Sequence, residues 1–170
     1  MTNFKEAVTV LSKAGISFIV VGAYAGVLQG SAQVTQDIDI CYERTKENMK
    51  RLAAALKPYH PRLRGAPGTL PFVVDERTLA QGMNFTFETD FGDIDLLGEL
   101  SGVGQFPDVA RDAIAIKLHG VSVRVAGLDT LIRSKRAAAR AKDLSALPEL
   151  EALRELLNVQ KQHKEKSKKR

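Results

Sequence analysis

Two aspartates stand two residues apart in the segment Asp37-Ile38-Asp39-Ile40. Acidic and apolar residues alternate here, which predicts a strand over 37–42 with one polar face. Alternate residues of a strand share a face, so both carboxylates would point the same way, about 6–7 Å apart. Like charges at this separation favour a cation between them, and hard oxygen ligands suit Mg²⁺. Taken alone, the pair also fits a half-exposed strand that carries acids and binds nothing.

A second acidic strand is predicted at Asp93-Ile94-Asp95-Leu96-Leu97, where the same alternation recurs. A third carboxylate on a neighbouring strand would complete a two-metal site, in which one metal activates an attacking oxygen and the other stabilises a leaving phosphate. Asp95 lies deeper in this strand and is the candidate ligand. Asp93 directly follows Gly92 and is better explained as a turn residue.

A candidate phosphate site precedes the first aspartate pair, in Ile19-Val20-Val21-Gly22-Ala23. A strand that ends in glycine and passes directly into a helix exposes backbone N–H groups at the helix start, and such groups bind phosphate. A single glycine of this kind is common in turns between a strand and a helix. The aspartate pair that follows makes the phosphate interpretation more specific.

Together these segments resemble the nucleotidyltransferase superfamily with the polymerase-β-like fold. The family pattern is a strand, Gly-Gly or Gly-Ser, a short helix, a glycine, commonly Arg-x-Thr-x-Asp-hydrophobic-Asp, and a later aspartate on a strand. The chain carries Gly22-Ala23, then Gly30, then Gln33-Val34-Thr35-Gln36-Asp37-Ile38-Asp39. It departs from the pattern at Ala23, where Gly or Ser is usual, and at Gln33, where Arg is usual. The similarity is to small bacterial members, including toxins of toxin–antitoxin pairs and relatives of aminoglycoside nucleotidyltransferases.

The resemblance implies a cofactor, a substrate and a set of site residues. The cofactor would be Mg²⁺ or Mn²⁺, and the nucleotide an NTP such as ATP. The catalytic and metal-binding residues would be Asp37, Asp39 and Asp95. The nucleotide-binding residues would be Gly22, Ala23, Ser31, Thr35 and Lys135. For Lys135, which lies on a predicted helix, the alternative is an exposed lysine without a ligand.

The implied reaction moves an NMP from an NTP to an acceptor hydroxyl on RNA, a protein or a small molecule. One form of this hypothesis is a toxin with an antitoxin protein as its partner, and another is an aminoglycoside-type enzyme. The alternative of a different class is a catalytically weak or inactive module that binds a nucleotide or a partner, which Ala23 and Gln33 favour. Arg62 and Arg64, in a predicted loop, are candidates for contact with an anionic acceptor.

The elements that must position these residues are predicted to form an α/β (α+β) fold, with a mixed sheet flanked by helices. We expect a nucleotidyltransferase core over 1–126, a helical segment packed on it over 127–158, and a disordered basic tail over 159–170. The predicted strands cover 17–21, 37–42, 72–74, 83–88, 93–97, 113–118 and 121–125. The predicted helices cover 4–14, 23–29, 45–56, 75–81, the segment from 128 onward, and a last helix after Pro148. Residues 59–71 are predicted to form a loop.

Composition limits the class of protein. The chain of 170 residues is 44% hydrophobic, which is ordinary for one globular domain. Cys41 is its only cysteine, so an internal disulfide and a cysteine-based zinc site are excluded. The first residues lack the layout of a signal peptide and no apolar stretch is long enough to span a bilayer, so we expect a cytoplasmic protein without membrane contact. The net charge of +5 resides in residues 159–170, either as a solvated end or as an arm that binds a polyanion.

Overall fold

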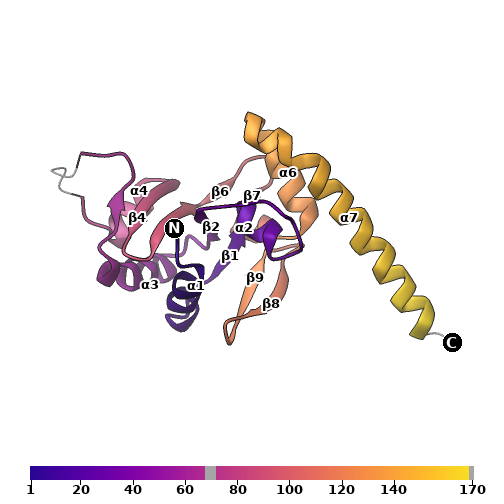
Figure 1. Cartoon of the computed structure of the whole chain (residues 1–170). Helices are drawn as coiled ribbons and strands as arrows, with labels where there is room; N and C mark the ends of the chain where they lie inside the picture. The colour runs from indigo at the N-terminus through magenta and orange to yellow at the C-terminus, as the bar shows by residue number, and fades with distance from the viewer. Residues whose placement is uncertain (68–71, 169–170) are drawn as a thin grey trace.

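The computed structural model describes residues 1–67 and 72–168 (Figure 1). A mixed seven-stranded sheet with the strand order β3-β4-β5-β2-β1-β9-β8 lies at its centre. These strands are β1 (Phe18–Val21), β2 (Asp37–Tyr42), β3 (Arg62–Leu63), β4 (Asn84–Thr89), β5 (Gly92–Leu97), β8 (Ile114–Leu118) and β9 (Val121–Val125). A separate small ribbon pairs β6 (Glu99–Leu100) with β7 (Gly104–Gln105).

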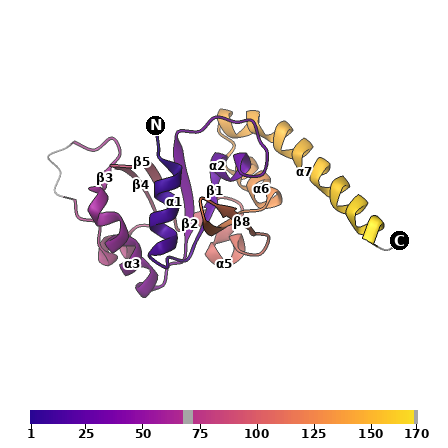
Figure 2. The same cartoon turned by 60° about the horizontal axis from the view of Figure 1, so that its bottom comes forward.

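The helices surround this sheet. They are α1 (Phe4–Lys13), α2 (Gly22–Val27), α3 (Lys46–Leu56), α4 (Glu76–Gln81), α5 (Phe106–Val109), α6 (Leu128–Ala138) and α7 (Ala141–Lys168), with a 3₁₀ turn at η1 (Lys57–Tyr59). Helices α1 and α3 lie together against the sheet, whereas α6 and α7 lie beyond α2 (Figure 2). The predicted mixed sheet flanked by helices, with C-terminal helices, is therefore confirmed. The boundary between the core and the helical segment at residue 126, and the end of that segment at residue 158, remain predictions.

The centre of the sheet is the strand β2, which pairs with β1 in antiparallel and with β5 in parallel orientation. Ile38 and Ile40 of β2 and Ile94 of β5 are fully buried, in the same core as Leu11 of α1 and Leu52 of α3. The polar residues between them face the other way, because side chains alternate along a strand. The apolar face of this strand pair thus anchors it, and the acidic face is left for the site.

Helix α7 differs from the prediction at both ends. It begins at Ala141, before Pro148, although proline removes one helical hydrogen bond and crowds the preceding turn. Buried Ala146 and Leu150 on either side of Pro148 pack into the core, which offsets that loss. The disordered tail expected from residue 159 is wrong as far as Lys168, because α7 continues to that residue and projects from the body (Figure 1). Lysine, glutamine and glutamate predominate there, and all three favour helix.

The other differences lie in short segments. Residues 72–74 form no strand; Phe72 instead packs on Phe87 of β4 with ring centroids 5.8 Å apart, while β3 takes the place beside β4 in the sheet. The predicted loop over 59–71 contains β3, and its residues 68–71 lie outside the described residues. The elements β6, β7 and α5 were not predicted. No helix among the described residues is both long and apolar enough to cross a membrane.

Candidate active site

Three aspartates from the two central strands meet on the polar face of the sheet. Asp39 of β2 pairs in register with Asp95 of β5, and Asp37 lies two residues before Asp39. Each offers one carboxylate oxygen, and these oxygens all lie within 4.8 Å of one another. Oxygens on opposite sides of a bound ion lie about 4.2 Å apart for Mg²⁺ and about 4.8 Å apart for Ca²⁺. The cluster is therefore compact enough for three carboxylates to share one divalent cation.

The close approach of these acids changes their protonation. Burial, followed by the charges of Asp37 and Asp95, raises the pKa of Asp39 to about 7. Burial also raises the pKa of Asp95, against the opposing charge of Arg64. A cation bound among the carboxylates would remove this repulsion and favour their charged forms.

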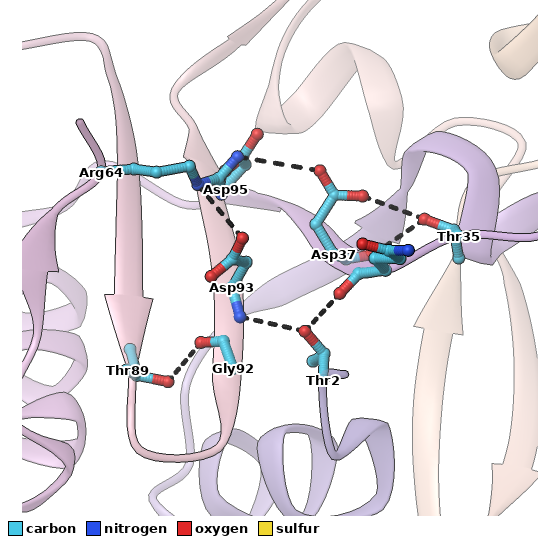
Figure 3. A network of polar contacts seen from close by, with 9 residues as sticks. Thr2, Thr35, Asp37, Arg64, Thr89, Gly92, Asp93 and Asp95 are labelled. Atoms are coloured by element: carbon cyan, nitrogen blue, oxygen red, sulfur yellow. Dashed lines mark hydrogen bonds and ion pairs between the residues drawn. The ribbon is translucent and has the colours of Figure 1, made fainter.

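Threonine side chains hold the start of β2 in place. The hydroxyl of Thr35 donates to Oδ1 of Asp37 over 2.9 Å, so it orients one of the three carboxylates. The hydroxyl of Thr2 donates to the carbonyl of Gln36 and accepts from the N–H of Asp93 over 2.9 Å (Figure 3). The N-terminal segment thereby links the residue before β2 to the start of β5.

Gly22 allows Asp39 to lie against the backbone at the start of α2. Its φ is +66°, a conformation that residues with a Cβ rarely adopt. A Cβ at this position would lie 2.0 Å from Oδ2 of Asp39. Ala23 follows as the second residue of α2, and both residues line the pocket described next.

A pocket of about 480 Å³ opens over the three aspartates. The loop over 33–36 forms part of its wall. Three basic side chains also line it: Lys135 of α6, Arg140 of the turn that follows α6, and Lys142 of α7. Acids and bases therefore line a single cavity. The charges of Lys142 and Lys135 lower the pKa of Asp39, so both bases lie within electrostatic reach of the three aspartates.

Asp143 holds two of these bases. Its side chain is 4% exposed and lies 3.5 Å from Nζ of Lys135, whose side chain is 13% exposed. Nε of Arg140 donates to its other oxygen over 2.5 Å. Although burial alone would raise it, Arg140 and Lys135 hold the pKa of Asp143 below its ordinary value. Lys135 is therefore no freely exposed helix lysine, which was the alternative interpretation.

Ser31 has a different place from the other predicted nucleotide-binding residues. It is buried and absent from the pocket lining. Its hydroxyl donates to Glu149 of α7 over 3.1 Å, and the same carboxylate accepts from the N–H of Ala32 over 2.6 Å. Ser31 thus helps to tie the loop before β2 to α7. Gln33 lines the pocket, and its Nε2 is buried without a hydrogen-bond partner among residues 1–67 and 72–168.

Arg64 is the site residue whose position the sequence did not reveal. Nη2 of Arg64 donates to Oδ1 of Asp95, Nε lies 3.4 Å from Oδ2 of Asp93, and Nη1 lies 3.9 Å from Oδ2 of Asp37 (Figure 3). The interpretation of Arg64 as a contact for an anionic acceptor did not foresee these three carboxylates. For Arg140 and Lys142 the sequence favours surface positions or contacts between helices, since exposed bases are common on helices; both instead line the pocket.

Comparison with known proteins identifies the fold. No protein-family model matches the chain, and neither does the sequence of any curated protein. Among solved structures, the lincosamide antibiotic adenylyltransferase LnuA, with lincomycin bound, matches with a TM-score of 0.58 and 11% identity, over 90% of this chain and 98% of that chain. The solution structure of the antibiotic-resistance factor ANT(2'')-Ia matches with a TM-score of 0.53 and 12% identity, over 94% and 91% of the two chains. Its complex with adenylyl-2''-tobramycin gives a TM-score of 0.51 and 13% identity, over 90% and 93%. The chain therefore has the nucleotidyltransferase fold that its sequence pattern resembles.

Proposed function

We propose that the chain is a divalent-metal-dependent nucleotidyltransferase that moves an NMP from an NTP to an acceptor hydroxyl. The observation that carries this proposal is the convergence of Asp37, Asp39 and Asp95 in a pocket that Lys135, Arg140 and Lys142 also line. Carboxylates suit a divalent cation, and bases suit phosphates. An NTP with its metal needs both kinds of group side by side.

Asp37 and Asp39 would hold Mg²⁺ or Mn²⁺, with Asp95 as the third ligand. The metal would neutralise phosphate charge. The acceptor oxygen attacks the α-phosphorus, the bond to the β-phosphate breaks, and pyrophosphate leaves. Asp95 would also accept the proton of the acceptor hydroxyl.

The nucleotide would lie between α2 and α6. Backbone N–H groups at Gly22 and Ala23 would face its phosphates, and Lys135, held by Asp143, would supply a positive charge. Thr35 would act mainly by orienting Asp37. Ser31 would support the same loop through Glu149 rather than contact the nucleotide.

The acceptor defines the finer alternatives. LnuA and ANT(2'')-Ia were solved with lincomycin and with adenylyl-2''-tobramycin, which makes a small-molecule acceptor one candidate. RNA and protein acceptors, a toxin role with an antitoxin partner, and the cytoplasmic location remain predictions from the sequence. A nucleotide-binding module without transfer is the second candidate function, because Gln33 offers a neutral amide where the family pattern has arginine.

The metal site can be tested by titrating the full chain with Mn²⁺ in a calorimeter. We expect Asp37→Asn combined with Asp39→Asn to abolish binding, because a hard cation loses two anionic ligands. Asp90→Asn is the matched control, since Asp90 is an exposed aspartate of the turn between β4 and β5 and lies outside the cluster of Asp37, Asp39 and Asp95. Equal Mn²⁺ affinity in the double variant and the unaltered protein would contradict the site assignment.

Transfer can be tested with α-³²P-labelled NTPs. Total RNA, a protein mixture, an aminoglycoside and a lincosamide serve as acceptors, with Mg²⁺ or Mn²⁺ present or absent. Label that appears on one acceptor only with metal, and is lost in the double aspartate variant, would support the enzyme and identify its acceptor class. Metal-dependent nucleotide binding without label transfer to any of them would favour the binding module.

A further inference from the structure

The backbone of Arg64 is held by β4, and its side chain extends to the aspartates of β2 and β5. It directly follows the short strand β3, and its N–H donates to the carbonyl of Thr86 on β4 over 2.9 Å. The pairing of Leu63 with Phe87 sets the position of this turn beside the central strands. The guanidinium crosses β4 and ends among carboxylates of β5 and β2 (Figure 3).

Arg64 contacts two of the three carboxylates that would bind the metal. These two are Asp37 and Asp95, whereas Asp93 contacts only the arginine. Both oxygens of Asp37 are engaged, Oδ1 by Thr35 and Oδ2 by the more distant guanidinium. A divalent cation that binds Asp37 and Asp95 must therefore share their charge with Arg64 or displace it.

The guanidinium is incompletely paired at this position. Nη2 makes a hydrogen bond to Asp95, but Nη1 is 3.9 Å from Asp37, beyond ordinary hydrogen-bond length. Nε is buried and forms no hydrogen bond in the described part of the chain, although Asp93 lies 3.4 Å away. A purely structural arginine usually satisfies its planar set of donors. Electrostatic attraction to several acids holds this one, with donors left for another acceptor.

We propose that Arg64 is an internal counter-ion that competes with the divalent metal for Asp37 and Asp95, and that it turns to the phosphates when the metal arrives with a nucleotide. This inference rests on the proposed metal-binding function of the cluster. A guanidinium and a divalent cation repel each other when they share the same carboxylates. Phosphate oxygens resolve the conflict, because they add negative charge and match the planar donors of arginine.

Two consequences follow for binding. Free metal should bind weakly to the unaltered protein, because it must displace a positive charge already paired with its ligands. Metal bound together with nucleotide should bind more tightly, because Arg64 gains a new partner. An arginine that served only to connect β3 with β5 would behave differently: its removal would leave metal affinity equal or lower.

The experiment compares Arg64→Gln with Arg62→Gln in the full chain. Arg62 is exposed and lies on the same short strand, so its variant controls for the loss of one positive charge nearby. Calorimetry with Mn²⁺ alone should show at least tenfold tighter binding for Arg64→Gln and a change under twofold for Arg62→Gln. With Mn²⁺ saturating, the affinity for α,β-methylene-ATP should fall at least tenfold in Arg64→Gln.

Thermal unfolding is measured first for each variant. If Arg64→Gln does not fold, Arg64→Lys replaces it, because lysine keeps a charge but cannot reach several carboxylates at once. We then expect about threefold tighter Mn²⁺ binding. Unchanged or weaker Mn²⁺ affinity in the Arg64 variant that is used would overturn the inference. The proposed metal site would stand in that case if the Asp37→Asn/Asp39→Asn variant still loses Mn²⁺ binding. Absence of Mn²⁺ binding in every variant and in the unaltered protein would overturn the proposed metal site as well.

Discussion

Replacement of Gly22 by alanine would bring a methyl group against the carboxylate of Asp39, one of the three proposed metal ligands. The added Cβ would lie 2.0 Å from Oδ2 of Asp39 and 2.7 Å from Cγ of the same residue. Ordinary contact begins at 3.4 Å, so the carboxylate would have to withdraw by about 1.4 Å. The site would then lose the geometry that brings its three ligand oxygens together.

Gly15→Ala is the matched control for this change. Gly15 has φ +65°, nearly the same as Gly22, but an added Cβ there meets nothing within 4 Å. Both variants should lose about 1–2 kcal/mol of unfolding free energy from the left-handed conformation alone. Only Gly22→Ala should lose Mn²⁺ affinity, by about 10–100-fold, which is the range seen when a residue that supports a metal ligand is altered.

Calorimetry with Mn²⁺ and urea denaturation measure the two quantities separately. Equal Mn²⁺ affinity in Gly22→Ala and Gly15→Ala would refute the idea that Gly22 makes room for a metal ligand. A loss in both variants would point instead to a general effect of backbone strain.

Four further predictions concern the protonation of Asp39, the basic residues of the pocket and the loop before β2. Because the pKa of Asp39 is raised from 3.8 to about 7, Mn²⁺ affinity should fall about tenfold for each pH unit below 7 and stay level above it, in calorimetry at several pH values. The folded protein holds this proton more tightly than the unfolded chain, so the contribution of Asp39 to metal-free stability should decline between pH 3.8 and about 7, as urea denaturation would show. Asp143→Asn should lower stability by about 2 kcal/mol and weaken binding of a fluorescent ATP analogue, because Lys135 loses the anion that positions it; an unchanged affinity would show that Asp143 does not position Lys135 for the nucleotide. Glu149→Ala should cost about 2 kcal/mol in urea denaturation, because the N–H of Ala32 loses a charged acceptor; a cost below 0.5 kcal/mol would show that the loop is held by other contacts.

Elements with a strong local signal could be predicted from the sequence. Alternation of acidic and apolar residues located β2 at Asp37–Tyr42. Thr45 caps α3 through a hydrogen bond to the N–H of Asn48, as a threonine before a helix predicts. His119 and Gly120, with φ +50° and +83°, form the expected two-residue turn between β8 and β9.

Features that depend on distant contacts could not be predicted. The strand β3 has two residues and therefore no periodicity, yet its pairing with β4 sends Arg64 to the aspartates. The turn between α6 and α7 contains Ala139 at φ +51°, where a glycine would have signalled a helix end. Without that signal, the sequence did not show that the turn brings Arg140 back to the pocket.

The parallel register of β2 and β5 places like charges opposite each other, which destabilises the folded state. Asp37 lies opposite Asp93 and Asp39 opposite Asp95, and like charges in facing positions oppose strand pairing. Fully buried Ile38, Ile40, Ile94 and Leu96 in the same strands supply the attraction that overcomes this repulsion. The chain therefore gives up stability at the place where it gains chemistry, and selection for thermal resistance alone would replace these aspartates with neutral residues. Their presence in the middle of the sheet is consistent with the proposed metal site.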